Sequence, residues 1–246
     1  MNVENERFRP DPSLSREEME ALQRDIAEAA VFEDQIDFDP TDIASGETLV
    51  AGIDQAFLED RAVSAVVVLR GDEVVERASA VTPLSIPYIP GLLAFREGDP
   101  ILAALETLDS DPDLLVFDGS GRIHFREAGI ATHVGVLFDT PAVGVAKSLL
   151  CGEPRQSVDS LPEGARIAIE ADDSMPDTPD GETVGYAYQS RQYPDSTKIN
   201  PLYVSSGHRL SAITAVDCVA ACGGAYKLPE PTRLADAYAD ELKETV

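Results

Sequence analysis

The chain has 246 residues, of which 45 are acidic and 19 are basic, and its formal net charge is −26. With 43% apolar residues it can bury a full hydrophobic core, and we expect a single α/β domain over residues 1–246. No apolar run approaches the roughly 20 residues of a membrane helix, and the N-terminus does not resemble a secretory signal. The three cysteines, Cys151, Cys218 and Cys222, exclude a disulfide-rich scaffold. We therefore expect a cytoplasmic protein without a membrane segment.

The negative charge at first argues against nucleic acid as a partner, because phosphates repel acidic surfaces. The acidic residues are, however, spread along the whole chain, and lysine occurs only at positions 147, 198, 227 and 243. Such a composition is expected of a protein kept soluble in concentrated salt, where a Debye length of about 3 Å at 1 M screens the repulsion. Our hypothesis is a halophilic cytoplasm.

The first third of the chain contains one helix signal and three strand signals. Residues 1–15 are polar and proline-bearing, which predicts a flexible N-terminal segment. Ser15 and Glu18 form a capping-box pattern before apolar residues at helical spacing, which predicts a helix near residues 16–31. Three strand-like runs follow and predict an antiparallel meander, at Thr48–Asp54, Ala62–Leu69 and Glu73–Val81.

The middle of the chain alternates helix and buried-strand patterns, which predicts strands joined in parallel through helices. Helix patterns cover about Leu92–Leu108 and Ala128–Phe138, and buried strands are predicted at Leu114–Asp118 and Ala142–Ala146. A meander followed by helix, strand, helix and strand is the order of a ribonuclease H-like mixed sheet flanked by helices, which is the fold class that we predict.

The last third predicts a hairpin and two helices. Strands at Arg166–Glu170 and Thr183–Gln189 flank the sequence DDSMPDTPDG, which we expect to be an exposed turn. Gly207 and its neighbouring serines predict a tight turn before a helix. The two helices are expected at Ser211–Cys222 and at about Thr232–Glu244.

Three acidic residues occupy informative places in this topology. Asp54 ends the first strand, Asp118 ends the first parallel strand, and Glu97 lies early in the helix between them. Carboxylates carried by these elements can converge at the carboxyl edge of the sheet, where they would suit the oxygen-loving Mg²⁺. Any one of them could equally be a solvated surface group.

Four further residues leave two interpretations open. Lys147 follows an apolar strand and forms either a structural salt bridge or a contact that neutralises a scissile phosphate. His208 is either an exposed histidine at a helix start or a group that orients the attacking water or helps hold a metal. His133, inside an apolar helix pattern, is either a packed residue or a surface residue. Tyr88, between two prolines that restrict the backbone, is either a platform or wedge for bases or a ring packed over the sheet.

Several long motifs resemble endonuclease V. They are AGIDQAF, PYIPGLLAFREG, DGSGRIHFREAGIATHVGVLFDTPAVGVAKSLLCG and SSGHRLSAITAVDCVAACGGAYKLPEPTRLAD, which together extend from about residue 49 to 238. The resemblance implies a magnesium-dependent endonuclease of DNA repair, with Mn²⁺ as a substitute. It would hydrolyse the second phosphodiester bond 3′ to deoxyinosine and leave a 3′ hydroxyl and a 5′ phosphate.

The resemblance also implies roles for individual residues. Asp54, Glu97 and Asp118 would hold the metal, and the catalytic set would be completed by His124, Lys147 and His208. A wedge that separates the strands at the lesion would consist of Pro87, Tyr88, Ile89 and Pro90. The flipped hypoxanthine would lie against Leu93, Gly119 and Gly129. The expected partner is inosine-containing DNA, or inosine-containing RNA, and we expect a monomer.

The chain departs from the family pattern at two places. The family usually has DGHG where this chain has Ser120 in DGSG, and it usually has valine, serine and tyrosine where this chain has Gln55, Ala56 and Phe57. Neither change removes a proposed metal ligand, but Ser120 leaves the range of lesions open. The alternatives are an inosine-specific endoribonuclease, a structure-specific nuclease of the same fold, or a non-catalytic inosine-binding protein.

Overall fold

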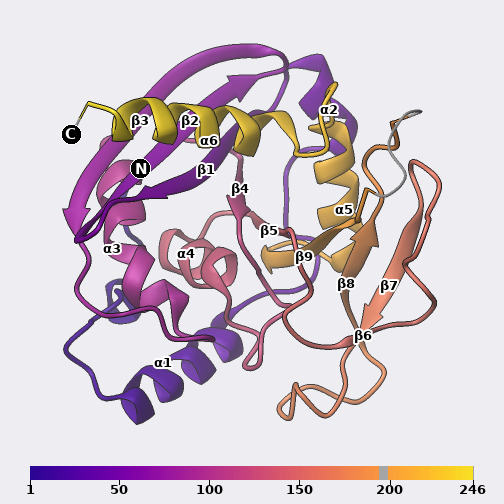
Figure 1. Ribbon diagram of the computed structural model, residues 1–246, viewed down its shortest axis with the longest axis horizontal. Coiled ribbons are helices and arrows are strands. Elements are labelled where there is room, and N and C mark those ends of the chain that lie inside the picture. Colours follow the sequence, from indigo (N-terminus) through magenta and orange to yellow (C-terminus); the bar gives the residue numbers. More distant parts are fainter. Residues whose placement is uncertain (194–198, 246) are drawn as a thin grey trace.

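The computed structural model describes residues 1–193 and 199–245, and these form a nine-stranded mixed sheet flanked by helices (Figure 1). The spatial order of the strands is β3-β2-β1-β4-β5-β9-β8-β7-β6. In chain order the strands are β1 Leu49–Phe57, β2 Arg61–Arg70, β3 Glu73–Pro83, β4 Leu114–Asp118, β5 Ala142–Ala146, β6 Glu153–Pro154, β7 Arg166–Glu170, β8 Thr183–Tyr188 and β9 Leu202–His208. The helices are η1 Glu6–Phe8, α1 Arg16–Ala29, α2 Pro40–Ser45, α3 Leu93–Leu105, α4 Ile130–Phe138, α5 Ala212–Ala221 and α6 Glu230–Lys243.

The pairing of the strands confirms the predicted fold class. Strands β1, β2 and β3 form the antiparallel meander, and β1, β4 and β5 pair in parallel. The predicted hairpin of β7 and β8 is also present, and it joins the same sheet through β9. Parallel neighbours carry their carboxyl ends to one edge of a sheet, so β1, β4 and β5 all end at the same edge.

Alternate side chains of the central strands point to opposite faces of the sheet, and each face is covered by its own layer of helices. On β4, Leu115 and Phe117 pack in the core beneath α1, α3 and α4, whereas Leu114 and Val116 pack in the core beneath α5. Helix α6 covers the apolar outer face of β1 and β2, where Ala235 packs on the β2 side chains. Each layer therefore buries one face of the sheet, and the carboxyl edge between the layers stays open for a site.

Strand β9 is the main departure from the sequence prediction, which placed a turn there. It pairs antiparallel with both β5 and β8, so it lies in the interior of the sheet. Its serines are buried and bonded: Ser205 Oγ accepts from Gly121 N at 3.0 Å, and Ser206 Oγ donates to Leu210 O at 2.5 Å. Polar residues satisfied by tertiary partners conceal the apolar alternation that identifies a strand in sequence.

The prediction of a flexible segment over residues 1–15 is wrong, because this segment is packed. Phe8 is buried in the core beneath α3 and α4, and its carbonyl is hydrogen-bonded to His133 Nε2 at 2.7 Å. The N-terminal ammonium donates to Leu108 O at 3.1 Å. One buried aromatic ring with anchored ends supplies the order that the local sequence lacks.

The loop between β7 and β8 is also less exposed than expected, since Met175 is buried against Ile169 and Val184. The three cysteines are buried and free. Among the residues described, no helix combines the length and the apolar character needed to cross a bilayer.

Candidate active site

Four of the predicted residues meet at the carboxyl edge of the sheet. The register pairs Ile53 with Phe117, so the next residues of β1 and β4, Asp54 and Asp118, lie side by side. Glu97 of α3 and Lys147, which follows β5, face the same space. Together they line a cavity of about 270 Å³. The convergence expected from the strand order is therefore present in the structure.

The electrostatics of this cavity are those of crowded, partly dehydrated carboxylates. Burial, followed by the charge of Asp118, raises the pKa of Asp54 to about 8. Burial also raises the pKa of Glu97 to about 7, with a smaller contribution from Asp118. Strongly shifted acids inside a cleft mark functional sites, because a fold without a use for them would leave such groups in water.

Lys147 supplies the positive charge at the mouth of the cavity. Its Nζ lies 2.5 Å from Asp118 Oδ2, while 54% of its side chain remains exposed. Burial lowers the pKa of Lys147, but the hydrogen bond to Asp118 and the charges of Asp54 and Asp236 raise it overall. The amine is thus held protonated and reachable by a phosphate from solvent.

A fourth acid, Asp236 of α6, lines the same cavity and was not predicted. Gly52 explains how α6 reaches it, because a Cβ at this position would lie 2.0 Å from the Pro231 carbonyl carbon. Asp54 lies two residues beyond Gly52, about 6.6 Å along β1, and Asp236 lies five residues beyond Pro231, about 7.5 Å along α6. The two acids therefore lie at about the same height along the strand and the helix. In the sequence, Asp236 looks like any acid on the polar face of an amphipathic helix. The one sequence signal for its role is that the last motif resembling endonuclease V ends at this residue.

The donor set of this cavity fits a hard divalent cation. Four carboxylates line it, and Gln55 Oε1 is a buried acceptor without a hydrogen-bond partner on the same wall. Within residues 1–193 and 199–245, no three acidic, histidine or cysteine side chains already stand close enough to ligate one ion. A divalent cation bound here would oppose the mutual repulsion of these acids.

A second cavity of about 150 Å³ adjoins the acidic one, and Ile130 lines both. It contains Leu93 and Gly129, as predicted, together with Ser120. Gly119 lies behind its wall, where a Cβ would meet Ile130 Cγ2 at 2.6 Å. A cavity of about 150 Å³ can hold one six-membered aromatic ring, such as the pyrimidine half of a purine. Its position beside the acidic cavity therefore suits a flipped base that enters ring first.

The Pro87–Pro90 segment stands at the mouth of the second cavity. Tyr88 lines that cavity and is 65% exposed, which makes it the most exposed large apolar side chain of the described residues. Ile89 turns inward and packs with Met19, Leu92 and Phe95. Tyr88 is thus presented to solvent on an anchored loop, and the alternative of a ring packed over the sheet is wrong.

His124 belongs to the second cavity and does not contact the acids. It is buried, with Nε2 3.1 Å from Gly91 O and Nδ1 accepting from Arg126 N at 3.2 Å. Burial, with the charge of Arg126, lowers the pKa of His124 to about 4, so the ring is neutral at pH 7. Its predicted place in the catalytic set changes to a place in the wall of the ring-sized cavity.

The prediction that His208 orients the attacking water is wrong. His208 pairs with Ala142 at the start of β5, whereas Asp118 pairs with Val145. These registers separate the two residues by about 10 Å along the strands and by about 10 Å across them. The His208 ring is buried, 3.1 Å from Asp139 and accepting from Val31 N at 3.2 Å. An antiparallel strand brought it to the other end of the sheet.

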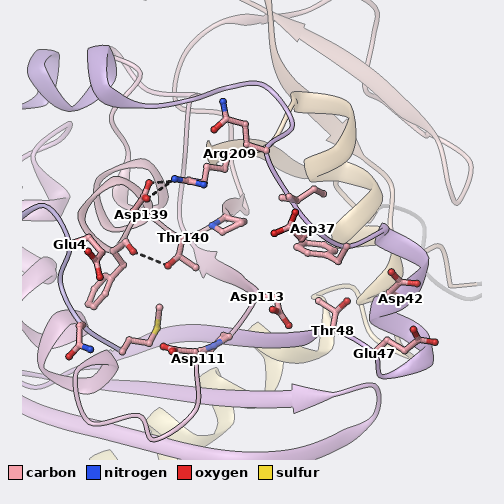
Figure 2. Close-up of a pocket in the computed structure, with 18 residues that line it drawn as sticks. Glu4, Asp37, Asp42, Glu47, Thr48, Asp111, Asp113, Asp139, Thr140 and Arg209 are labelled. Carbon is pink, nitrogen blue, oxygen red and sulfur yellow. Dashed lines mark hydrogen bonds and ion pairs between the residues drawn. The ribbon is translucent and has the colours of Figure 1, made fainter.

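The largest cavity of the described residues lies at that other end and measures about 670 Å³ (Figure 2). Its wall carries seven acidic residues, Glu4, Asp37, Asp42, Glu47, Asp111, Asp113 and Asp139. Arg209 is its only lysine or arginine and is bonded to Asp139 (Figure 2). A wall of this charge repels phosphates.

Comparison with known proteins identifies the family of this chain. The sequence profile of the endonuclease V family matches residues 31–237. This chain belongs to the endonuclease V family. It is 73% identical over 243 residues to the endonuclease V of the halophilic archaeon Natronomonas pharaonis, and the match covers 99% of this chain and 98% of that protein. The chain is accordingly an endonuclease.

Solved endonuclease V structures have the same fold. The enzyme from Streptomyces avermitilis superimposes with a TM-score of 0.79 at 34% identity, covering 94% of each chain. The Ciona intestinalis endonuclease V, in complex with a 24mer DNA containing an inosine followed by a ribo-adenosine, has a TM-score of 0.76 at 28% identity and covers 94% of this chain and 98% of that one.

Proposed function

We propose that this endonuclease V family member is a divalent-metal-dependent enzyme of DNA repair that cuts DNA near deoxyinosine. It would hydrolyse the second phosphodiester bond on the 3′ side of the lesion and leave a 3′ hydroxyl and a 5′ phosphate. The observation that carries the proposal is the junction of two cavities at one sheet edge. One presents four carboxylates and a lysine, the other accepts an aromatic ring, and Ile130 lines both.

The ring-sized cavity would bind the flipped base. Leu93 and Gly129 line it, and the backbone at Gly129 can approach a base closely because no side chain intervenes. Exposed Tyr88 would insert between bases and separate the strands, at a cost of a few kcal/mol in lost stacking that contacts with the extruded base offset. Recognition then holds the scissile phosphate over the acidic cavity.

The acidic cavity would hold Mg²⁺, or Mn²⁺ in its place, through Asp54, Asp118, Glu97 and Asp236. When bound, such an ion neutralises negative charge on the phosphate and lowers the pKa of water. Lys147 Nζ would contact a non-bridging oxygen and stabilise the charge that develops there. In the reaction, a water oxygen bonds to phosphorus as the P–O3′ bond breaks, and the departing O3′ takes up a proton.

A denaturing gel tests this proposal directly. End-labelled duplexes with and without one deoxyinosine are incubated in molar KCl with Mg²⁺, with Mn²⁺ or with EDTA. We expect one cut at the stated bond, dependent on the lesion and on the metal. Cutting in EDTA would overturn the metal dependence, and cutting at another bond would overturn the stated position.

An inosine-specific endoribonuclease is the second candidate, favoured by the ribo-adenosine after the inosine in the DNA bound to the Ciona protein. The same assay on matched RNA and on DNA with a single ribonucleotide 3′ to the inosine separates the two. Cutting at least tenfold faster on the ribonucleotide substrates would make RNA the substrate. Binding to inosine without any product would instead indicate a non-catalytic protein.

We also propose that the enzyme acts as a monomer in the cytoplasm. The three cysteines are free and buried, which suits a reducing compartment. Sedimentation in molar KCl, alone and with inosine-containing duplex, tests the monomer, because a dimeric species would contradict it.

A further inference from the structure

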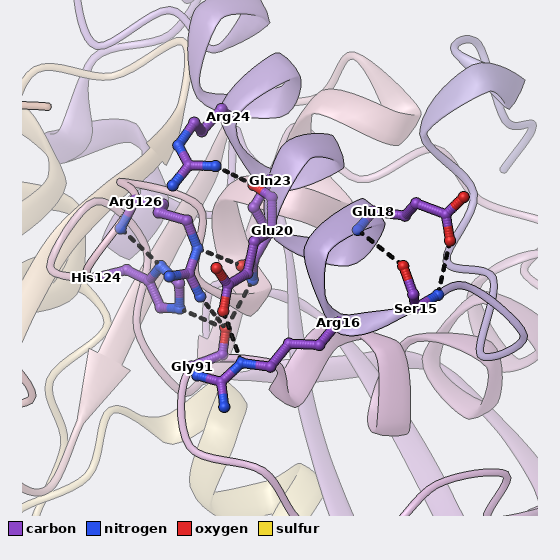
Figure 3. A network of polar contacts seen from close by, with 9 residues as sticks. All are labelled: Ser15, Arg16, Glu18, Glu20, Gln23, Arg24, Gly91, His124 and Arg126. Atoms are coloured by element: carbon purple, nitrogen blue, oxygen red, sulfur yellow. Dashed lines mark hydrogen bonds and ion pairs between the residues drawn. The ribbon is translucent and has the colours of Figure 1, made fainter.

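The first helix holds a buried amide whose donor group bonds two residues that line the second cavity. Gln23 of α1 is 1% exposed and lines that cavity. Its Nε2 donates to Gly91 O at 2.9 Å and to Ala128 O at 3.4 Å, and its Oε1 accepts from Arg126 Nε at 2.8 Å (Figure 3). A buried glutamine that uses both its donor and its acceptor groups acts as a specific connector, because an apolar residue could fill the same volume without polar cost.

The partners of Gln23 belong to the two sides of the cavity. Gly91 ends the loop that presents Tyr88, and it has the left-handed φ of +79° that glycine permits. Ala128 precedes Gly129, whose close contact with Ser120 leaves no room for a side chain. The amide therefore ties the loop of the proposed wedge to the wall of the proposed base pocket.

Gly91 O is the centre of this network. Besides the hydrogen bond from Gln23 Nε2, it accepts hydrogen bonds from His124 Nε2 at 3.1 Å and from Arg126 Nη2 at 3.2 Å (Figure 3). Because Arg126 N donates to His124 Nδ1, the hydrogen of the neutral ring lies on Nε2 and points at Gly91 O. Three donors on one carbonyl fix the end of the Tyr88 loop.

Helix α1 gives this connector a rigid support. Ser15 and Glu18 cap its first turn reciprocally, with bonds of 2.8 Å and 3.3 Å, and Arg16 is paired with Glu20 at 2.8 Å (Figure 3). On its inner side Ile26 is fully buried in the core beneath α3 and α4. The amide of Gln23 is thus held by packing that does not itself touch the cavity.

We infer that Gln23 is a positioning residue of the endonuclease, which sets the Tyr88 loop at a fixed distance from the base pocket so that strand separation and base capture occur together. The inference rests on the proposed function. Its consequence is specific to duplex DNA, where a base must be unpaired and the opened stack held apart. In a single strand the lesion base is already unpaired and needs less help from the loop.

Two substitutions separate positioning from packing. Gln23→Met keeps the length and removes every hydrogen bond, whereas Gln23→Glu keeps an acceptor for Arg126 and removes the amide donors to Gly91 and Ala128. We expect both variants to lose about tenfold or more in kcat/KM on inosine-containing duplex. On the matching single strand we expect a loss below about threefold, and Ile26→Val on the same helix should leave the ratio of the two substrates unchanged. Wild-type duplex activity in either Gln23 variant, or equal losses on both substrates, would overturn the inference.

Hydrogen exchange tests the same idea without cleavage. Peptides that cover residues 84–96 should exchange faster in Gln23→Met than in Ile26→Val, when both are compared at equal global stability. Equal protection in the two variants would overturn the role of Gln23. Failure of the wild-type protein to cut any inosine substrate would instead overturn the proposed function and leave the exchange result to decide the positioning role.

Discussion

The two ends of the central sheet both carry clusters of acids, yet they differ in what surrounds those acids. At the carboxyl edge, burial raises the pKa of Asp54 to about 8 and that of Glu97 to about 7. At the opposite end, the acids surround a wider cavity, and the hydrogen bonds from Arg209 and His208 outweigh burial and lower the pKa of Asp139. Neither the number of acids nor the size of a cavity identifies the site. The site is identified by acids that are buried next to one another.

The strongest test of this difference is to remove acids singly at each end of the sheet. Asp54→Ala and Asp118→Ala should each reduce cleavage of inosine-containing DNA on the order of a thousandfold, because each removes a carboxylate that no neighbour replaces. Asp37→Asn in the larger cavity should leave cleavage unchanged. Gel assays in molar KCl measure all three, with circular dichroism to confirm folding. Retained activity in either alanine variant would remove that residue from the site.

Asp236 tests whether α6 truly completes the acidic cavity. Asp236→Asn should lower cleavage on the order of a hundredfold, since one charge is lost while the other three acids remain. Asp240→Asn, equally exposed on the same helix but outside the acidic cavity, is the matched control and should be silent. If the two variants behaved alike, the fourth acid would be a surface group.

Cation binding should distinguish the two ends in the absence of substrate. At ten times its Kd, Mg²⁺ would stabilise the fold by about 1.4 kcal/mol and raise Tm by about 3 to 6 °C. Asp54→Asn should abolish this shift and Asp37→Asn should preserve it, as followed by thermal unfolding with and without EDTA at constant KCl. The reverse pattern would place the cation in the larger cavity.

His208 should affect stability and not chemistry. His208→Asn should change cleavage by less than about threefold and cost about 1 to 2 kcal/mol of unfolding free energy, because a buried ring loses its partners. A large loss of kcat at unchanged stability would return His208 to the catalytic set.

The environment of His208 determines whether the stability of the fold rises or falls with pH. Burial lowers its pKa from 6.5, against the opposing effect of Asp139, so the unfolded chain binds a proton more readily than the folded one. Its contribution to stability is therefore complete above pH 6.5 and is lost as the pH falls below that value. Denaturant titrations between pH 8 and pH 5 should show a shallower decline for His208→Asn than for the wild type.

The sequence by itself predicted the meander, the two parallel strands and the acids that end them. Periodicity identifies such elements because β4 and β5 are apolar throughout, and the strand order fixes that Asp54 and Asp118 end at one edge. The long motifs also carried the family, and the structure brings Tyr88 of the predicted wedge together with Leu93 and Gly129 of the predicted base pocket around one cavity.

Only the tertiary structure decided the rest, because those features depend on contacts between distant segments. Buried serines hide β9, and the antiparallel direction of that strand moves His208 away from the acids. In the sequence, Asp236 resembles any acid on a polar helix face. Its place in the cavity depends on Gly52, which lacks a side chain and so lets α6 pack closely against β1. Gln23 resembles any polar residue of an amphipathic helix, and its role follows only from the carbonyls of Gly91 and Ala128, which lie 68 and 105 residues along the chain. Local sequence determines elements, whereas partners far along the chain determine which side chains meet.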